Sequence, residues 1–155
     1  MQPAPVFRRA RPEEAAVLSE IAFAAKRFWG YPDEWMAGWR DELTLTPDHI
    51  RASPVWVVEL GGETAGFFGL KQADNLWHLE HLWVRPSRIG NGLGRALFDE
   101  AVRQARAAGV TELRIKCDPN AELFYLKMGA VRTGLEVYQH LGKIRRELPL
   151  LSYQL

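Results

Sequence analysis

The chain has 155 residues, of which 47% are apolar and 25% are charged, and its formal net charge is +1. These shares are average for a globular protein and exclude the collagen-like, coiled-coil and disordered classes. The near-neutral balance also argues against a dedicated nucleic-acid binder, which usually carries a strong positive charge. The length predicts a single domain, which we assign to residues 1–155.

Cysteine content and hydropathy indicate the cellular compartment in which we expect the protein. Cys117 is the one cysteine, so the sequence offers neither an intramolecular disulfide nor a CxxC-type metal site. No stretch approaches the roughly 18 uncharged apolar residues of a membrane helix, and the N-terminus contains no apolar signal segment. We therefore expect a cytoplasmic protein with no metal site and with neither membrane nor nucleic acid as a partner.

The first third of the chain is predicted to be mainly helical. A short strand at 6–10 precedes a helix that begins near Pro12 and reaches Arg27, with one apolar face made of Val17, Leu18, Ile21, Ala22 and Ala25. The segment 30–32 ends this helix. A second helix then carries Trp35, Met36 and Trp39, and Thr46-Pro47-Asp48 begins a third.

The rest of the chain alternates strands with two helices. Strands at 55–60, 64–70 and 76–84, joined by short polar or glycine-containing turns, predict an antiparallel meander. The remaining predicted elements are an amphipathic helix at 93–108, a strand at 113–117, a short helix at 118–128 and two weaker strands within 131–155, the better one at 146–151.

A glycine cluster joins the third meander strand to the amphipathic helix. Residues 88–95 read Arg-Ile-Gly-Asn-Gly-Leu-Gly-Arg, at a point where unpaired backbone N–H groups and a positive helix end converge. Glycines allow a close approach of the backbone, and the two arginines add positive charge. The pattern predicts a phosphorylated ligand; the alternative is that the glycines only form a tight turn.

Two better-known phosphate loops do not fit this cluster. The nucleotide P-loop needs Lys followed by Ser or Thr after its last glycine, and none is present here. The dinucleotide fingerprint needs Gly-x-Gly-x-x-Gly in a parallel unit, whereas Gly94 comes one position early and the preceding strand ends a meander. Because Glu112 lies downstream, a dinucleotide-binding oxidoreductase stays open as a rival interpretation.

Residues 82–97 and 118–130 resemble two segments of the GNAT superfamily of acyl-CoA-dependent N-acyltransferases. The first resembles the family's pyrophosphate-binding strand, loop and helix, and the second is similar to the following strand and helix. Ile89 departs from the pattern, since the family usually has Gln or Arg there. The resemblance covers nearly the whole chain and implies an α/β fold: one GNAT-like domain whose central mixed, mainly antiparallel sheet is flanked by helices.

The resemblance implies acetyl-CoA (coenzyme A) as the cofactor. Its pantetheine arm would pair with the third meander strand like an added strand, and its pyrophosphate would lie on the amides of the glycine cluster. The cofactor-binding residues implied are Leu82, Trp83, Val84, Arg88, Gly90, Asn91, Gly92, Leu93, Gly94, Arg95 and Asn120. For Asn120, the alternative to a coenzyme contact is a cap of the short helix.

Acetylation of an amine requires a neutral nucleophile, but an alkylamine of pKa near 10.4 is neutral only about 0.04% of the time at pH 7. We expect Glu80 to be the general base, with His78 or His81 as alternatives. The competing interpretation is that Glu80 pairs with a neighbouring arginine. Strand alternation places His78, Glu80, Leu82 and Val84 on one face unless a bulge interrupts it.

The departing thiolate needs a proton, and the resemblance implies Tyr125 as the donor, with core packing as the alternative role. A backbone N–H near Val84 would polarise the thioester carbonyl. Cys117 has the character of a small buried apolar residue rather than an acetyl carrier, which favours direct transfer.

The sequence thus predicts an enzyme that transfers the acetyl group of acetyl-CoA to a primary amine of a small molecule, peptide or protein. The alternative is a non-catalytic acyl-CoA-binding sensor of the same fold. An aromatic group of Trp29, Tyr31, Trp35 and Trp39 falls in the helices that roof the acceptor site in this family. It favours an apolar or aromatic acceptor, unless the rings only pack the helices onto the sheet. The C-terminal strands offer an edge for a homodimer.

Overall fold

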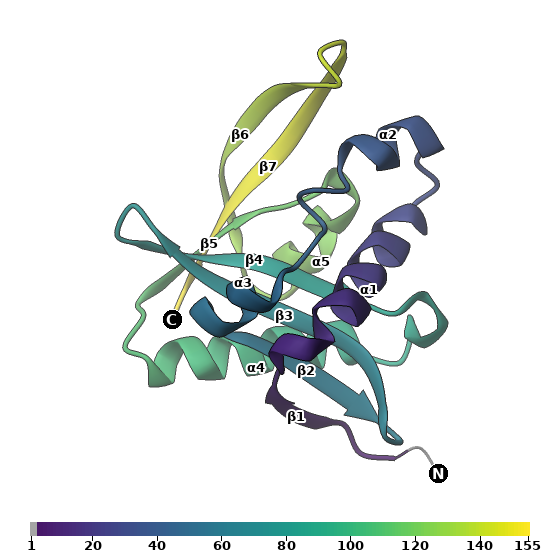
Figure 1. Cartoon of the computed structure of the whole chain (residues 1–155). Helices are drawn as coiled ribbons and strands as arrows, with labels where there is room; N and C mark the ends of the chain where they lie inside the picture. Colours follow the sequence, from purple (N-terminus) through teal and green to yellow (C-terminus); the bar gives the residue numbers. More distant parts are fainter. Residues whose placement is uncertain (1–2) are drawn as a thin grey trace.

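A computed structural model describes residues 3–155 (Figure 1). Seven strands form one sheet in the order β1-β2-β3-β4-β5-β7-β6. The strands are β1 (Val6–Arg9), β2 (Val55–Leu60), β3 (Glu63–Ala73), β4 (Leu76–Val84), β5 (Glu112–Lys116), β6 (Val131–His140) and β7 (Ile144–Gln154). The helices are α1 (Ala15–Arg27), α2 (Asp33–Gly38), α3 (Pro47–Ala52), α4 (Leu93–Ala107) and α5 (Glu122–Lys127), with 3-10 turns at Pro12–Glu14, Pro86–Arg88 and Pro119–Ala121.

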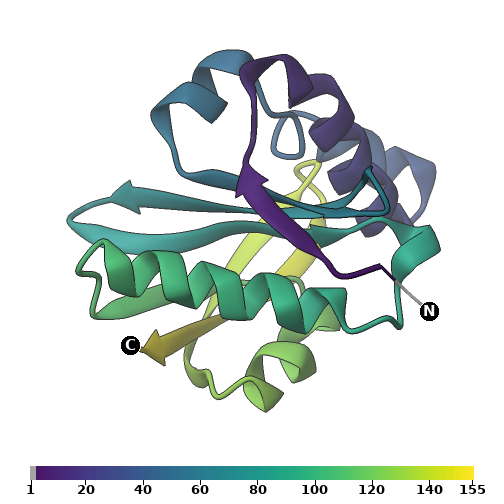
Figure 2. The same ribbon diagram turned by 90° about the horizontal axis from the view of Figure 1, so that it is seen from below.

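Helices cover both faces of the sheet (Figure 2). One face carries α1, α2 and α3, which bury Leu18, Met36 and Ile50 against β2 and β3. The other face carries α4 and α5, which bury Leu97 and Phe98 among residues of β3, β5 and β7. Only the β4–β5 pair is parallel among the described strands. The predicted α/β class with a mixed, mainly antiparallel sheet is confirmed.

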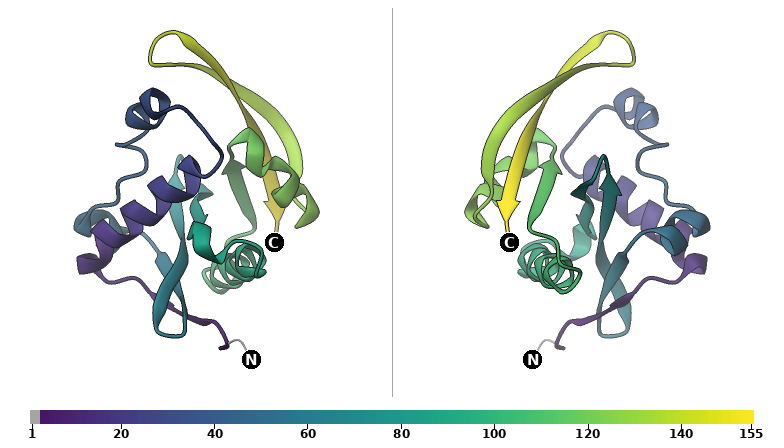
Figure 3. Two further views of the ribbon diagram at one scale, coloured as in Figure 1. Left: turned by 90° about the vertical axis from the view of Figure 1, so that its right-hand side faces the viewer. Right: turned by 90° about the vertical axis from the view of Figure 1, so that its left-hand side faces the viewer.

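The predicted elements all form, with boundaries that differ by a few residues. The first helix begins with a 3-10 turn, and β3 and the C-terminal strands run further than expected. Val17 is wrong as a core position: it is exposed, because the buried stripe of α1 is made of Ala15, Leu18, Ile21, Ala22 and Ala25. The long β6–β7 hairpin places its tip beside α2 (Figure 3).

Strands β4 and β5 separate soon after they meet. They pair only at Trp77 with Leu113 and at His78 with Arg114. Beyond these pairs β4 stays bonded to β3 as far as Val84, and β5 stays bonded to β7. The edge of β4 that faces β5 therefore has no strand partner over residues 79–84. That edge lies at the centre of the sheet, which makes it available to an extended ligand.

A β-bulge lies in the middle of β4. Gly69 of β3 faces His81, and the next residue, Leu70, faces Leu79, so Glu80 is left without a partner. The bulge shifts the alternation of side chains by one position. Leu79 and Leu82 both pack on the α4 side of the sheet, whereas Glu80 and His81 both face α3. The uninterrupted alternation is therefore wrong beyond Glu80, and Leu82 does not share the face of Glu80.

Candidate active site

A cavity of about 310 Å³ opens between the end of α1, the free edge of β4, the glycine cluster and α5. The predicted residues Leu82, Trp83, Val84, Gly94, Asn120 and Tyr125 line it, together with Ala25, Phe28, Trp29, Ile89, Ala121 and Phe124. Residues separated by as many as 100 positions, from Ala25 to Tyr125, are thus brought to one apolar cleft. Ile89, the departure from the family pattern, contributes an apolar side chain to this lining.

The glycine cluster borders the cavity through Ile89 and Gly94. Gly90 and Gly92 have φ angles of 91° and 76°, in the left-handed region that glycine adopts without strain. Gly92 is the N-cap of α4, and the first hydrogen bond of the helix runs from the amide of Ala96 to Gly92. The amides of Leu93, Gly94 and Arg95 consequently have no partner within α4, as at any helix start. They form a site suited to an anion.

The side chains of the glycine cluster differ in their suitability as ligand contacts. Leu93 is buried in the core, so only its backbone amide is available. Asn91 and Arg95 are exposed, and neither lines the cavity. Arg88 lies with its Nε 3.9 Å from Glu63 Oε1, on the β3 side of the cluster, and does not line the cavity either. The anion site therefore consists of backbone groups, with Arg88 and Arg95 at its margin.

Tyr125 occupies the cavity wall on the α5 side. The residue is buried, with its ring 6.0 Å from the ring of Phe98 and 5.1 Å from that of Phe124. Burial raises the pKa of its hydroxyl well above the ordinary value of 10, so the group is protonated at neutral pH. Within residues 3–155 this hydroxyl makes no hydrogen bond, which leaves a proton donor at the cavity wall.

Glu80 projects from the bulge toward α3. Its Oε1 lies 2.7 Å from His49 Nε2, although the two groups are not aligned as a hydrogen bond, and 3.8 Å from His81 Nε2. Its Oε2 lies 3.6 Å from Nζ of Lys71, a half-exposed side chain. The pairing of Glu80 with an arginine is therefore wrong; its neighbours are two histidines and a lysine. The position of His49 was not anticipated, because α3 carries no motif that points to β4.

His81 is a neutral side chain with a defined tautomer. Burial lowers its pKa from 6.5 to about 4. Trp83 Nε1 donates a hydrogen bond of 3.1 Å to His81 Nδ1, so the ring proton of the neutral imidazole is on Nε2, which faces Glu80. The grouping of His49, Glu80 and His81 is close enough to hold a metal ion. The protonated Nε2 does not fit that role, because a ligating nitrogen needs its lone pair.

Cys117, at the end of β5, is buried, and burial raises the pKa of its thiol to about 12. A protonated thiol is a poor nucleophile. Its surroundings thus favour a packing role, as the sequence indicated, and leave direct transfer from coenzyme to acceptor as the simpler chemistry.

Most side chains of the aromatic group Trp29, Tyr31, Trp35 and Trp39 pack against other parts of the chain rather than lining the cavity. Tyr31, Trp35 and Trp39 surround the cations Lys26 and Arg146, with Lys26 Nζ 4.0 Å from the centre of the Trp39 ring. Trp39 is 1% exposed, and its Nε1 donates to Tyr138 of β6 at 2.8 Å. These rings pack the helices onto the β6–β7 hairpin. Trp29 differs, because it lines the cavity, 6.0 Å from the ring of Trp83.

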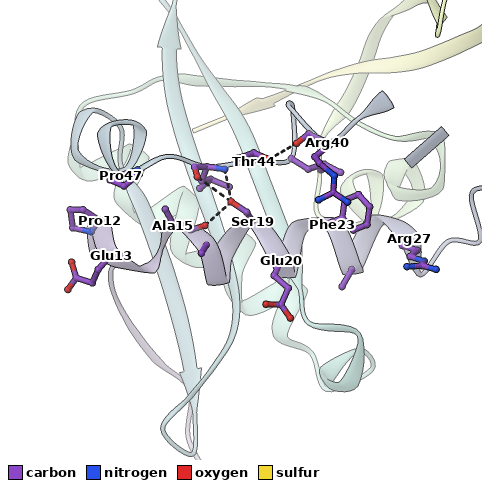
Figure 4. A pocket seen from close by; sticks show the side chains of 14 residues that line it. Pro12, Glu13, Ala15, Ser19, Glu20, Phe23, Arg27, Arg40, Thr44 and Pro47 are labelled. Atoms are coloured by element: carbon purple, nitrogen blue, oxygen red, sulfur yellow. Dashed lines mark hydrogen bonds between the residues drawn. The ribbon is translucent and has the colours of Figure 1, made fainter. Parts of the chain in front are cut away.

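A larger hollow of about 720 Å³ lies on the outer side of α1, between that helix and residues 40–47 (Figure 4). Its lining combines apolar side chains with Arg40, which stacks 4.2 Å from the ring centre of Phe23. Ser19, at its base, is hydrogen-bonded to the backbone of Leu45. None of the predicted site residues lines this hollow, and it contains no paired acid and base groups aimed at one point. The smaller cavity is the better candidate.

Residues 18–130 match the family model described as the Acetyltransferase (GNAT) family. The match spans well over half of the chain, so the chain belongs to the GNAT family of acetyl-CoA-dependent N-acetyltransferases. The resemblance noted in the sequence is confirmed, and the rival oxidoreductase interpretation is not supported. No helix within residues 3–155 combines the length and hydropathy that a membrane crossing requires.

Relatives agree with this assignment. The chain is 32% identical over 148 residues to the peptidyl-lysine N-acetyltransferase YjaB of Salmonella typhimurium, with 94% of each chain covered. Among solved structures, a GCN5-related N-acetyltransferase from Rhodopseudomonas palustris has a TM-score of 0.81 at 25% identity, covering 100% of this chain and 98% of that one. The PaiA N-acetyltransferase of Thermoplasma acidophilum, solved with coenzyme A, shares the fold with a TM-score of 0.75 at 18% identity and coverage of 98% and 99%.

Proposed function

We propose that this enzyme transfers the acetyl group of acetyl-CoA directly to a primary amine, with Glu80 as general base and Tyr125 as general acid. The observation that carries the coenzyme and Tyr125 parts of the proposal is the composition of the cavity, which Glu80 does not line. One cleft is bounded by a free strand edge, the amides at the start of a helix, and a protonated tyrosine that has no hydrogen-bond partner among residues 3–155. These three features match three parts of the coenzyme: its amide arm, its pyrophosphate and its sulfur.

The pantetheine arm lies along the free edge of β4 in this proposal. Leu82, Trp83 and Val84 supply backbone groups, in the manner of strand addition. The pyrophosphate rests on the amides from Gly90 to Arg95. The flexible side chains of Arg88 and Arg95 add long-range attraction for the phosphates without entering the cavity.

Starting from the acceptor ammonium, the reaction removes two protons from the nitrogen and supplies one proton to the sulfur. Glu80 accepts a proton from the acceptor ammonium, and the neutral amine attacks the thioester carbonyl carbon. The C–N bond forms and the C–S bond breaks. Tyr125 gives its proton to the departing thiolate and regains one from the nitrogen of the intermediate, directly or through water. Glu80 releases its proton to solvent, so the products are the amide, free coenzyme A and one proton. A backbone N–H near Val84 polarises the carbonyl oxygen during the attack.

The surroundings of β4 support Glu80 over the histidines as the base. His81 binds the Trp83 proton at Nδ1 and carries its own proton on Nε2, so it has no free lone pair to accept another. His78 lies at the parallel contact with β5, opposite Arg114, where the two strands are still paired. Glu80 lies at the bulge, next to the point where the strands separate.

For the acceptor, we propose the side-chain amine of a lysine in a peptide or protein. The Salmonella relative, which covers nearly the same length, is a peptidyl-lysine N-acetyltransferase. An acceptor selected by its aromatic character has less support, because the rings of Tyr31, Trp35 and Trp39 are occupied by Lys26 and Arg146 of the same chain.

We also propose a dimerisation surface and a cellular compartment. The outer edge of β6 ends the sheet and offers a pairing surface for a homodimer. The buried free thiol of Cys117 fits a reducing, cytoplasmic compartment.

The proposal is tested by following thiol release from acetyl-CoA with a set of lysine-containing peptides. We expect peptide-dependent release by the wild type, and a loss of at least 100-fold in kcat for Glu80→Gln with coenzyme affinity preserved. Coenzyme binding without release on any peptide or small amine would instead support the non-catalytic sensor. Equal rates for wild type and Glu80→Gln would remove Glu80 from the mechanism.

A further inference from the structure

The hydroxyl of Tyr31 is the centre of a polar cluster behind the coenzyme cavity. It donates to Asp118 Oδ2 at 2.8 Å, and it accepts from Asn120 Nδ2 and from a terminal nitrogen of Arg146, each at 3.0 Å. A phenol has one proton to donate and lone pairs to accept, so both capacities are used. Burial and the bond to Asp118 raise the pKa of Tyr31, which keeps the donated proton in place.

The same cluster determines the orientation of the Asn120 side chain. Its Nδ2 donates a second hydrogen bond, of 3.0 Å, to Asp118 Oδ1. A carboxylate oxygen only accepts, so the amide nitrogen must be the atom that faces Asp118 and Tyr31. Both N–H groups of the amide are then used inside the protein. The carbonyl oxygen is the one polar atom of this side chain left for the cavity that Asn120 lines.

Asp118 rather than Asn120 caps the turn that leads into α5. Its side chain accepts from the backbone N–H of Asn120 at 2.8 Å, so the interpretation of Asn120 as the cap is wrong. The Asp118 side chain is 4% exposed and lies 3.5 Å from Lys26 Nζ and 3.3 Å from Arg146. With this carboxylate held by two cations, the cluster has a rigid base to which Tyr31 ties Asn120.

We propose that Tyr31 is a positioning residue for the coenzyme: it holds the Asn120 amide so that its carbonyl oxygen accepts a hydrogen bond from an N–H of the bound ligand. The pantetheine arm carries two amide N–H groups, which are donors of the required kind. The inference rests on the placement of the coenzyme in this cavity. It gives the connection between α1 and α2 a role in coenzyme binding, in addition to the packing of Tyr31 against Trp35 and Trp39.

The substitution Tyr31→Phe isolates the hydroxyl. The ring packs at 5.8 Å from Trp35 and 4.9 Å from Trp39, and a phenylalanine preserves both contacts. Only the hydrogen bonds of the oxygen are lost, namely those to the two carboxylate oxygens of Asp118 and those from Asn120 and Arg146. Tyr138→Phe is the matched control, because its hydroxyl accepts from Trp39 in the same roof but has no hydrogen bond to Asn120 or Asp118.

The test is a double-mutant cycle on coenzyme A affinity, measured by calorimetric titration of Tyr31→Phe, Asn120→Ala, the double variant and Tyr138→Phe. We expect Tyr31→Phe to raise Kd about three- to tenfold, the effect of one net hydrogen bond, and Asn120→Ala to raise it at least as much. Adding Tyr31→Phe to Asn120→Ala should change Kd by less than about twofold, because Tyr31 acts through Asn120. Tyr138→Phe should bind within about twofold of the wild type.

Two results would overturn the inference: a wild-type Kd for Tyr31→Phe, or single effects that multiply in the double variant. A further variant, Gly94→Glu, separates this failure from a misplaced coenzyme, since it puts a carboxylate at the start of α4. If Gly94→Glu weakens binding and Asn120→Ala does not, the cavity holds the coenzyme and the role of Tyr31 is refuted. If Gly94→Glu binds normally, the placement itself is wrong, and the inference is wrong with it.

Discussion

Gly66, on β3 opposite Val84 of β4, is the position where one added methyl group should be most destabilising. A Cβ added there would lie 2.6 Å from the carbonyl oxygen of Trp83 and 3.1 Å from Leu97 Cδ1. Ordinary contacts begin near 3.4 Å, so the oxygen is about 0.8 Å too close (3.4 minus 2.6). Because that oxygen belongs to the backbone that we assign to the pantetheine arm, Gly66→Ala should disturb both stability and coenzyme binding.

The magnitude follows from two opposing effects. Overpacking a core costs about 1–3 kcal/mol, and replacing glycine stabilises by about 0.4–1 kcal/mol through the unfolded chain. We expect a net loss of about 1–2 kcal/mol, which for a chain of this size lowers Tm by roughly 3–8 °C. Coenzyme A affinity should fall at least tenfold, because Trp83 and Val84 must shift to relieve the contact.

Gly69, three residues along the same strand, is the matched control. A Cβ at Gly69 would meet its nearest atom, His81 Cδ2, at 3.5 Å, an ordinary contact. Gly69→Ala should therefore unfold within about 3 °C of the wild type and bind coenzyme A normally. Thermal unfolding and calorimetric titration of both variants decide the matter. If Gly66→Ala keeps wild-type affinity while it loses stability, the edge of β4 at Trp83 is not a coenzyme contact.

Three further outcomes are expected. Tyr125→Phe should reduce the kcat for thiol release about 10- to 100-fold while coenzyme A binds as tightly as before; a reduced affinity with unchanged kcat would contradict the proton-donor role. The depressed pKa of His81 means that the unfolded chain binds the extra proton between pH 6.5 and about 4, so stability should fall by about 2 kcal/mol between pH 7 and pH 5. Urea unfolding at the two pH values should show a smaller drop for His81→Gln, and an equal drop would refute the assignment. Cys117→Ser should retain acetyl transfer to within about threefold, whereas complete loss in a folded variant would indicate an acetyl-cysteine intermediate.

The order and type of the elements follow from local signals in the sequence. Strand β4 has the predicted ends, because Pro86 and a polar turn bound a run of apolar and aromatic residues. Helix α3 begins where predicted, with the side chain of Thr46 accepting from the amide of His49. Gly109 and Gly129 follow helix ends with φ angles of 80° and 107°. Each of these signals acts over a few residues, so a single sequence is enough to interpret it.

Predicting the site in full would have required contacts between residues that are far apart in the sequence. The bulge at Glu80 depends on how β3 pairs with β4, and no turn or proline marks it in the sequence. The contact of His49 with Glu80 depends on how α3 packs on the sheet. The hydrogen bond from Tyr31 to Asp118 joins residues 87 positions apart. Motifs thus identified six of the twelve residues that line the cavity. The other lining residues, and the residues that hold the side chains in place, became visible only in the packed structure.

The central claim is that coenzyme A occupies the cavity between β4, the start of α4 and Tyr125. The most direct test is amide hydrogen exchange of the purified protein with and without coenzyme A, resolved to short segments. The account predicts slower exchange on binding in residues 82–84 and 90–95, with no change in residues 40–47 beside the larger hollow. Protection confined to residues 40–47, or absent from both segments of the cavity, would contradict it.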